Sequence, residues 1–278
     1  MRKLIFIDLD GTLLSSDKKI SKENRDAIRS AEEKGLKVII CTGKVFKSAK
    51  RFAHEVGING PLISCNGAEI RDIATERLLY SNFLRKEDCY KVIDICRRKK
   101  IYFHAYIDHD MFTEMDECPT PLYWIENTEV PEEYRINIRV ISDFMEVVKN
   151  SSQNVSKFLM VSKDPEQLSE VRSLLERIDT VSVMCSGDDN IEVVNKNVNK
   201  GKALAIVSES NEYKGYDIVA MGDSENDLSM LLESQYKIVM GNADESLKKI
   251  ADFISATNDE NGVAIAIELI LNYNPNNL

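Results

Sequence analysis

The sequence lacks paired cysteines. Its six cysteines are scattered along 278 residues, and no two of them form a Cys-x-x-Cys pair. Neither a zinc knuckle nor a thioredoxin-like redox motif is therefore predicted. Free cysteine is among the most buried residue types, and thiols stay reduced in the cytosol. We expect mostly buried, reduced thiols in a cytoplasmic protein.

An excess of positive charge and a long apolar run are also missing. The formal net charge is −10, which argues against a duplex-binding surface, because such a surface normally needs a basic patch. No segment approaches the roughly 20 apolar residues of a membrane span. The apolar run near the start is broken at Asp8, which makes it too short for a signal peptide. We expect no nucleic acid and no membrane among the partners, but a small anionic ligand stays compatible with this charge.

Two acids follow the first apolar run. Residues 4–7 are short and rich in large aliphatic side chains, which predicts a strand buried on both faces of a parallel sheet. Asp8 and Asp10 come next, and Gly11 allows a sharp turn. Ligands of open α/β sheets bind beyond the carboxyl ends of the strands. The strand is expected to deliver both acids to such a site, although the same residues also fit a plain polar turn.

Thr42 and Lys200 each stand near the start of a predicted helix. Thr42 follows a buried strand at residues 37–41, where free backbone N–H groups favour an anion, or where the threonine simply caps the helix. Lys200 lies at the N-terminus of a predicted helix, where the helix dipole disfavours a cation. It is either placed there to meet an anion or is an ordinary solvated surface lysine. Both positions could therefore hold an anion or be structural.

Asp223 and Asp227 follow another strand end. Alone, they fit an N-cap and a first-turn acid. If this strand neighbours the first, four acids that include Asp8 and Asp10 surround one cleft, and they repel one another unless a cation lies among them. Oxygen ligands of this kind suit Mg²⁺, and Lys200 could then hold a phosphoryl group.

The spacing of strands and helices predicts two units. Residues 1–81 and 189–278 alternate between strand and helix, which predicts a three-layer α/β/α core. Residues 82–188 contain more strand and irregular loops, which predicts an inserted α+β unit. An exposed loop is expected over residues 115–131, and a frayed polar tail over residues 274–278.

A second polar cluster lies in the inserted unit. His104, Asp108, His109 and Asp110 could suggest a metal site. Their position on a strand and the turn after it is more typical of polar surface, which is our prediction.

Taken together, the strand-end motifs resemble the haloacid dehalogenase (HAD) superfamily of phosphohydrolases, and specifically its Cof-type branch, subclass IIB. Asp-x-Asp-Gly-Thr-Leu stands at residues 8–13, Thr-Gly at Thr42, Lys-Gly at Lys200, and Gly-Asp-x-x-Asn-Asp at residues 222–227. Further similar pieces are Asn-Gly-Ala at 66–68, Met-Gly-Asn-Ala at 240–243 and Asn-Gly-Val-Ala at 261–264. The resemblance covers essentially the whole chain, most loosely in the middle.

The resemblance implies a Rossmann-like HAD core at residues 1–81 and 189–278 and a C2B-type cap at residues 82–188 that selects the substrate. It implies Mg²⁺-dependent hydrolysis of a small phosphomonoester through an aspartyl-phosphate. The protein itself is expected to be a monomer or a homodimer. A sugar phosphate, pyridoxal phosphate or a nucleotide would be the substrate.

The resemblance also implies roles for single residues. Asp8 is the nucleophile, and Asp10 is the general acid and then the general base. Thr42 and Lys200 bind the phosphoryl oxygens. Mg²⁺ is held by Asp8, the backbone carbonyl of Asp10 and Asp223, with Asp227 in support. The phosphate- or substrate-binding set is completed by Leu9, Gly43, Asn226 and Asn242.

One residue departs from the family pattern. The motif that begins at Thr42 usually continues Thr-Gly-Arg, but here Lys44 takes the place of the arginine. Lysine lacks the bidentate fork of arginine, so no role is carried over to Lys44.

Three alternative functions are supported to different degrees by the sequence. A sugar phosphomutase of similar fold would need its aspartyl-phosphate protected from water. A non-enzymatic phospho-switch or binding protein is disfavoured by Asp10, because a switch benefits from lacking an acid/base two residues after its phosphorylated aspartate. Dinucleotide binding is not predicted, because no Gly-x-Gly-x-x-Gly follows the first strand.

Overall fold

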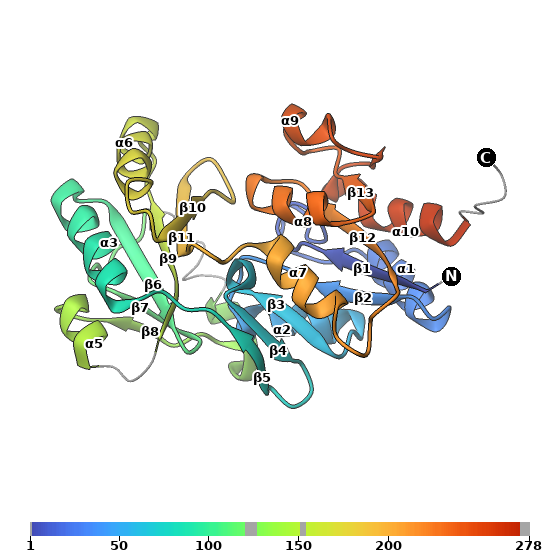
Figure 1. Ribbon diagram of the computed structural model, residues 1–278, viewed down its shortest axis with the longest axis horizontal. Helices are drawn as coiled ribbons and strands as arrows, with labels where there is room; N and C mark the ends of the chain where they lie inside the picture. Colours follow the sequence, from blue (N-terminus) through green and yellow to red (C-terminus); the bar gives the residue numbers. More distant parts are fainter. Residues whose placement is uncertain (1, 120–126, 151–153, 273–278) are drawn as a thin grey trace.

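The chain folds into two lobes that lie side by side (Figure 1). The computed structural model describes residues 2–119, 127–150 and 154–272. The core lobe contains the elements up to β5 and from α7 onward, and the cap lobe contains the elements from α3 to β11. The predicted tail, and residues 120–126 of the predicted loop, lie outside the described residues.

The core lobe is built on a parallel five-stranded sheet. The strand order is β14-β13-β12-β1-β2. Ile5 of β1 lies between Val219 of β12 and Val38 of β2. The strands are β1 (Lys3–Ile7), β2 (Lys37–Ile40), β12 (Asp217–Gly222), β13 (Tyr236–Val239) and β14 (Phe253–Ile254).

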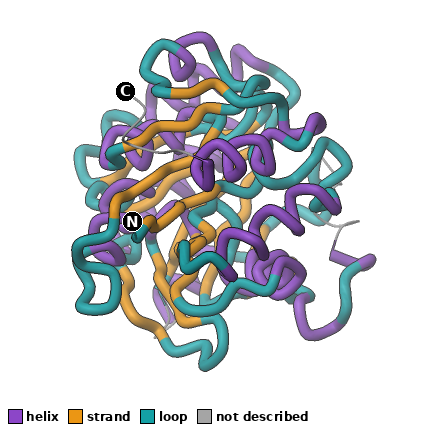
Figure 2. The backbone as a smooth tube through the Cα atoms, turned by 90° about the vertical axis from the view of Figure 1, so that its right-hand side faces the viewer, coloured by secondary structure: helices purple, strands orange, loops and turns teal. Residues whose placement is uncertain are grey.

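Helices cover both faces of this sheet, because its central strands are apolar on both sides (Figure 2). Ile5 and Ile7 pack with the helices on one face, and Leu4 and Phe6 pack with those on the other. Each fully buried aliphatic side chain contributes about 1.5–3 kcal/mol. The first face carries α1 (Lys22–Glu33), α2 (Phe46–Val56) and α10 (Gly262–Asn272), and the second carries α7 (Lys200–Ser208), α8 (Leu228–Glu233) and α9 (Glu245–Lys248).

A small antiparallel sheet extends the core beside β2. It consists of β3 (Pro61–Ser64), β4 (Glu69–Asp72) and β5 (Leu78–Ser81). A single parallel bridge joins Cys41 to Ile63 of β3. The Asn-Gly of the piece at residues 66–68 belongs to a short 3-10 turn, Cys65–Gly67, that connects β3 to β4.

The cap lobe is an α+β insertion with a six-stranded sheet. Helices α3, α5 and α6 pack on one face, where alternate residues such as Phe103 and Phe158 are buried. The opposite face carries Tyr106, Lys157 and Glu192, which line a cavity against the core. In sheet order the strands are β10 (Val181–Met184), β11 (Asn190–Asn195), β9 (Val155–Val161), β6 (Tyr102–Ile107), β7 (Asp110–Thr113) and β8 (Ile138–Val140). The helices are α3 (Lys86–Lys99), α5 (Phe144–Asn150) and α6 (Pro165–Leu175).

The chain crosses between the lobes at two adjacent points. The Asn195 side chain donates a hydrogen bond to the carbonyl of Phe83, at 3.0 Å, and so joins the two crossings. β11 pairs with β9 and β10 inside the cap sheet, so the chain returns to the core after Asn195, beyond the predicted limit at residue 188.

The prediction that His104 belongs to a polar surface is wrong. His104 is fully buried on β6, between the hydroxyl groups of Tyr102 and Tyr106. Burial lowers the pKa of His104 to about 3, with the charge of Lys157 acting in the same direction. The imidazole is therefore neutral at neutral pH.

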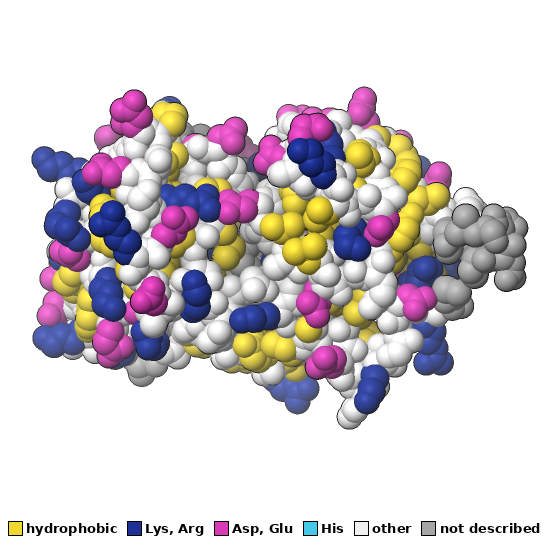
Figure 3. All heavy atoms as spheres, turned by 45° about the horizontal axis from the view of Figure 1, so that its top comes forward, with side chains coloured by type: hydrophobic (Ala, Val, Ile, Leu, Met, Phe, Trp, Pro, Cys, Tyr) yellow, Lys and Arg dark blue, Asp and Glu magenta, His cyan; other side chains and the backbone are white. Residues whose placement is uncertain are grey.

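Most of the cysteines are buried, as the sequence predicts. All six cysteines are free, and Cys41, Cys65, Cys89 and Cys96 are buried. No helix in the described part of the chain combines the length and apolar character needed to cross a membrane. On the face that Figure 3 shows, basic and acidic side chains are intermixed over both lobes rather than gathered by sign.

Candidate active site

The register of two parallel strands brings the predicted acids together. Ile7 of β1 pairs with Met221 of β12, and the Asp8 backbone N–H donates to the Met221 carbonyl at 3.1 Å. Asp8 and Asp223 therefore leave the sheet at the same edge. The turn at Gly11 brings the Thr12 hydroxyl within 2.6 Å of Asp223 Oδ1, to which it donates a hydrogen bond.

Asp8, Asp223 and Asp227 form an acidic group at this edge. Each offers a carboxylate oxygen, and these oxygens all lie within 4.8 Å of one another. Burial raises the pKa of Asp8 well above its ordinary value, although Lys200 opposes this shift. Burial and the charge of Asp227 raise the pKa of Asp223 to about 7. Such crowding is relieved by a cation, and the oxygen donors suit a divalent metal.

Lys200 lies at the centre of this group. Its side chain is completely buried, so the interpretation as a solvated surface lysine is wrong. Lys200 Nζ lies 2.7 Å from Asp8 Oδ1 and 2.6 Å from Asp227 Oδ1. Burial alone would lower the pKa of Lys200, but the charges of Asp227 and Asp8 hold it above its ordinary value. The lysine stays protonated and offsets part of the acidic charge.

The side chain of Asp10 faces a different partner set. Its oxygens lie 2.9 Å from Lys18 Nζ and 3.1 Å from Lys44 Nζ, outside the acidic group. Burial would raise the pKa of Asp10, but Lys44 and Lys18 outweigh it and hold the pKa below its usual range. Two carboxylates that are two residues apart thus have opposite surroundings.

Thr42 is not the N-cap of α2. That position belongs to Val45, so the capping interpretation is wrong. The Thr42 backbone is tied to β3 and the following turn, because its N–H donates to Ile63 and its carbonyl accepts from Asn66, both at 3.0 Å. Its hydroxyl accepts from the Lys44 N–H at 3.2 Å. The loop Thr42-Gly43-Lys44 therefore has a fixed place beside Asp10.

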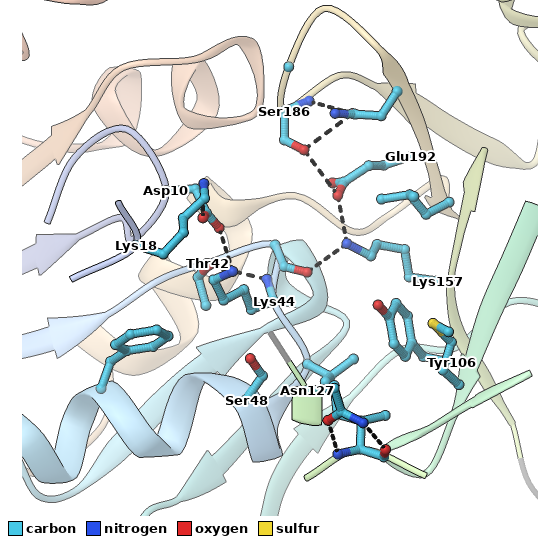
Figure 4. A pocket seen from close by; sticks show the side chains of 18 of the residues that line it. Asp10, Lys18, Thr42, Lys44, Ser48, Tyr106, Asn127, Lys157, Ser186 and Glu192 are labelled. Atoms are coloured by element: carbon cyan, nitrogen blue, oxygen red, sulfur yellow. Dashed lines mark hydrogen bonds and ion pairs between the residues drawn. The ribbon is translucent and has the colours of Figure 1, made fainter. Parts of the chain in front are cut away.

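A cavity of about 320 Å³ opens between the lobes at these residues. Figure 4 shows Asp10, Lys18, Thr42 and Lys44 on one side and the cap side chains on the other. The core side also includes Asp8, Gly43, Ser224 and Asn226, and the cap side includes Tyr106, Lys157, Ser186, Asn190 and Glu192. A small molecule in this cavity would contact both lobes.

Three of the predicted binding residues, Lys200, Leu9 and Asn242, are not among the residues that line the cavity. Lys200 lies behind Asn226, to which it donates a hydrogen bond at 3.3 Å. The Leu9 side chain is fully buried in the core cluster, so only its backbone could face a ligand. Asn242 donates to the Gly11 carbonyl at 2.9 Å and accepts from the Asn258 N–H at 3.0 Å. Asn242 thus braces the turn after Asp10.

Lys18, Lys157 and Glu192 were not predicted from the sequence. The structure places Lys18 on Asp10 and pairs Lys157 with Glu192 at 2.6 Å, with both side chains almost fully buried. The available signal was weak: Lys157 and Glu192 are charged residues at alternating positions of apolar strands, which a solvent-facing strand also shows.

Comparisons with known proteins agree with this architecture. The family model of haloacid dehalogenase-like hydrolases matches residues 5–267. Two phosphatases of Bacillus subtilis, YwtE and YcsE, are both described as 5-amino-6-(5-phospho-D-ribitylamino)uracil phosphatases. YwtE is 32% identical over 97% of this chain and 98% of its own, and YcsE is 34% identical over 95% and 94%.

The fold matches solved structures equally completely. A haloacid dehalogenase-like hydrolase from B. subtilis superimposes with a TM-score of 0.85 at 28% identity, over 96% of this chain and 99% of that chain. The family match spans the four motifs at residues 8–13, 42–43, 200–201 and 222–227, and the inserted cap. This chain therefore belongs to the haloacid dehalogenase-like hydrolases, as a Cof-type member with a Rossmann-like core and a cap, and it is a phosphatase of small phosphorylated compounds.

Proposed function

We propose that this phosphatase depends on Mg²⁺ and transfers the phosphoryl group through Asp8. The observation that carries the proposal is the contrast between Asp8 and Asp10. Asp8 is buried against Lys200 and the acidic group, whereas Asp10 lies at the cavity between Lys18 and Lys44. Without a cation the pKa shifts run against these roles, because burial raises the pKa of Asp8 while Lys18 and Lys44 lower that of Asp10. A cation bound beside Asp8 would favour the ionised carboxylate that a nucleophile needs.

The acidic group supplies the oxygen ligands that Mg²⁺ prefers. Asp8 and Asp223 would hold the ion, together with the Asp10 carbonyl that the family resemblance implies. Both oxygens of Asp227 already accept hydrogen bonds, from Lys200 and from the N–H groups of Asp223 and Ser224, which favours a supporting role. A bound Mg²⁺ would neutralise negative charge between the carboxylates and the phosphoryl group.

The proposed reaction has two steps. First, a carboxylate oxygen of Asp8 bonds to phosphorus, the ester P–O bond breaks, and Asp10 gives its proton to the leaving oxygen. Asp10 then takes a proton from water, whose oxygen bonds to phosphorus as the bond to Asp8 breaks. The phosphomonoester and water thus become an alcohol and inorganic phosphate.

Lys18 and Lys44 fit this sequence. They keep Asp10 ionised in the free protein, and an incoming phosphate dianion competes for both ammonium groups. Asp10 is then able to carry the proton that the first step requires. This assigns to Lys44, in place of the family's arginine, a position beside the acid/base.

Thr42 and Lys200 are proposed to hold the phosphoryl oxygens. Thr42, Gly43 and Asn226 line the cavity, and Lys200 donates a hydrogen bond to Asn226 from behind it. Leu9 would contribute through its backbone. Asn242 would act through the Gly11 turn that it braces.

The cap, which we propose to extend over residues 82–195, would select the leaving group. Its cavity face combines Tyr106 with the polar side chains of Ser186 and Asn190. A small ester with a hydroxylated or ring-containing leaving group fits this lining. The panel to test consists of sugar phosphates, pyridoxal phosphate, nucleotides and the 5-amino-6-(5-phospho-D-ribitylamino)uracil named for two relatives.

The test is phosphate release from this panel with Mg²⁺ and with EDTA. Wild type is expected to turn over with Mg²⁺ only. Asp8→Asn should abolish turnover, and Asp10→Asn should lower it by about 10²–10⁴-fold. Asp26→Asn, on the exposed face of α1, is the matched control and should keep wild-type rates.

Absence of turnover from a folded, Mg²⁺-binding wild type would contradict the hydrolase and favour the switch. Recovery of the phosphate on a second position of the substrate would instead favour the mutase. Because all six thiols are free, we further propose a cytoplasmic protein. Its assembly as a monomer or a homodimer stays a prediction.

A further inference from the structure

Lys157 is a buried lysine of the cap that reaches the core. Its side chain, on β9, is 4% exposed. Lys157 Nζ donates to Glu192 Oε1 at 2.6 Å within the cap, and to the backbone carbonyl of Gly43 at 2.7 Å across the cavity (Figure 4). Gly43 lies in the loop between Thr42 and Lys44. The cap therefore places a positive charge directly on the loop that is proposed to bind phosphate.

Glu192 continues the contact toward Lys200. Its second oxygen accepts a hydrogen bond from Asn66 of the core. Asn66 Oδ1 accepts from Asn226 Nδ2 at 3.2 Å, and Asn226 Oδ1 accepts from Lys200 Nζ at 3.3 Å. An unbroken series of hydrogen bonds thus runs from the cap to Lys200, which itself bonds Asp8.

The fit around Gly43 is close. A Cβ atom at Gly43 would lie 3.0 Å from Asn66 Oδ1 and 3.3 Å from Glu192 Oε2. Such a distance is shorter than ordinary carbon–oxygen contact, so the loop packs directly against the side chains that carry the hydrogen-bond series. A shift of the cap sheet would therefore change the packing around Gly43.

The ion pair between Lys157 and Glu192 does not depend on the core lobe. Lys157 and Glu192 are both cap residues, so they stay paired when the lobes separate. Only the contacts with Gly43 and Asn66 are lost on opening. A buried ion pair costs desolvation and is weak as a stabilising device. The pair instead supplies two contacts with the core, to Gly43 and Asn66, that exist only while the cap is closed.

We propose that Lys157 is a positioning residue which, with Glu192, couples closure of the cap to the alignment of the Thr42–Lys44 loop and of Lys200. The proposal rests on the proposed function, because it assumes that this loop and Lys200 hold the phosphoryl group. Lys157 acts on all substrates alike, since it sets the phosphate side of the site rather than the leaving-group side.

The test compares Lys157→Met with Lys157→Met/Glu192→Gln. The double variant leaves no unpaired charge in the cap and keeps an acceptor for Asn66, so it guards against loss of folding. Arg85→Met is the matched control, because it removes a cap ion pair with the buried Asp88 that has no contact with the core loop. Thermal melting verifies that each variant is folded.

The first readout is kinetic. We measure kcat and KM for two esters with different leaving groups, p-nitrophenyl phosphate and the best ester of the panel, and the inhibition constant of inorganic phosphate. Both Lys157 variants should lose about tenfold in kcat for both esters and bind inorganic phosphate about tenfold more weakly, as expected for a lost charge-assisted hydrogen bond. Arg85→Met should keep wild-type values.

The second readout does not require activity. Thr42 and Lys44 accept backbone hydrogen bonds from Asn66 and Cys65. Amide hydrogen exchange in the peptide over residues 63–67 should be about tenfold faster in the double variant and unchanged in Arg85→Met. This readout holds even if the wild type hydrolyses none of the esters, so failure of the proposed function and failure of the coupling are distinguishable.

Three outcomes would overturn the coupling. A kcat loss confined to one ester would make Lys157 a residue that recognises the leaving group. Unchanged kinetics in the folded double variant would make the pair purely structural. Unchanged amide exchange over residues 63–67 would show that the loop is aligned without the cap.

Discussion

Gly11 adopts a left-handed backbone conformation, and its position has no room for a side chain. Its φ is +75°, and a Cβ atom there would lie 2.2 Å from Asp223 Oδ2. We predict that Gly11→Ala loses about 1–2 kcal/mol for the left-handed backbone and also displaces Asp223. A displacement of about 1 Å at this proposed metal ligand is expected to lower kcat by about hundredfold.

Gly35 provides the control for this prediction. Its φ is +85°, and nothing lies within 4 Å of its Cβ position. Gly35→Ala should therefore lose similar stability, measured by urea unfolding, and keep full phosphatase activity. Equal activity of the two variants would contradict a role for the Gly11 turn in placing Asp223.

His104 predicts a pH dependence of stability. Its pKa is about 3 in the folded protein, through burial and the charge of Lys157, against about 6.5 when it is exposed. Between these values the unfolded state binds the extra proton, so the free energy of unfolding falls by about 1.4 kcal/mol for each pH unit below about 6.5. Stability is complete above pH 6.5 and is lost as the pH falls.

The variant His104→Gln lacks this titration and keeps groups that can bond the hydroxyls of Tyr102 and Tyr106. The free energy of unfolding of wild type minus that of the variant should therefore decrease from pH 7.5 to pH 5. Urea unfolding at several pH values measures this difference. A difference that does not change with pH would contradict the buried neutral imidazole.

At the scale of elements, helix α6 of the cap is tied to the acidic loop of the core. Arg172 forms two hydrogen bonds with Glu225, at 2.7 and 3.1 Å, and Glu225 lies between Asp223 and Asp227 in the sequence. Both side chains are partly exposed, so the pair should contribute about 0.2–1 kcal/mol. We predict that Arg172→Met raises KM by up to about fivefold, because the closed cap loses one attachment.

The control removes only the neighbouring contact within the helix. Arg172 also pairs with Glu176 at 2.9 Å, so Glu176→Gln should leave KM unchanged. Salt screens partly exposed pairs, and the difference between wild type and Arg172→Met should shrink at about 1 M salt. An increase of KM in Glu176→Gln of the same size would contradict a contact between the lobes.

The elements also show what the sequence could predict. Asp8, Asp223 and Lys200 could be predicted as site residues because strand ends and helix starts are local patterns, and parallel pairing of β1 with β12 places Asp8 and Asp223 at one edge. Lys157 and Glu192 were not found, because their contacts depend on how the cap sheet lies over the core. His104 was misjudged because an alternating strand does not reveal which of its faces is covered.

At the scale of the whole molecule, the two lobes meet around one cavity and are joined by two adjacent crossings. Most of the apolar core is divided between clusters inside each lobe, and a smaller cluster with Val45 and Tyr106 joins them. The three acids of the acidic group all belong to the core lobe, whereas Lys157 and Glu192 belong to the cap. Closure and metal binding can therefore be measured separately.

Mg²⁺ should stabilise the whole molecule through the acidic group alone. A ligand that binds only the folded state adds about 2.7 kcal/mol at a concentration of about 100 Kd. We predict this increment for wild type, and its loss in Asp223→Asn. Without metal, Asp223→Asn should be at least as stable as wild type, because one of the crowded carboxylate charges is removed and an oxygen remains to accept from Thr12.

Urea unfolding with a Mg²⁺ titration measures both effects. Asp26→Asn removes a carboxylate of the same type from the exposed face of α1, and it should keep the full increment. If Asp223→Asn also kept it, the ion would bind elsewhere on a chain whose net charge is −10. Loss of the increment in Asp223→Asn alone would place the ion at the ends of β1 and β12, where the proposed chemistry requires it.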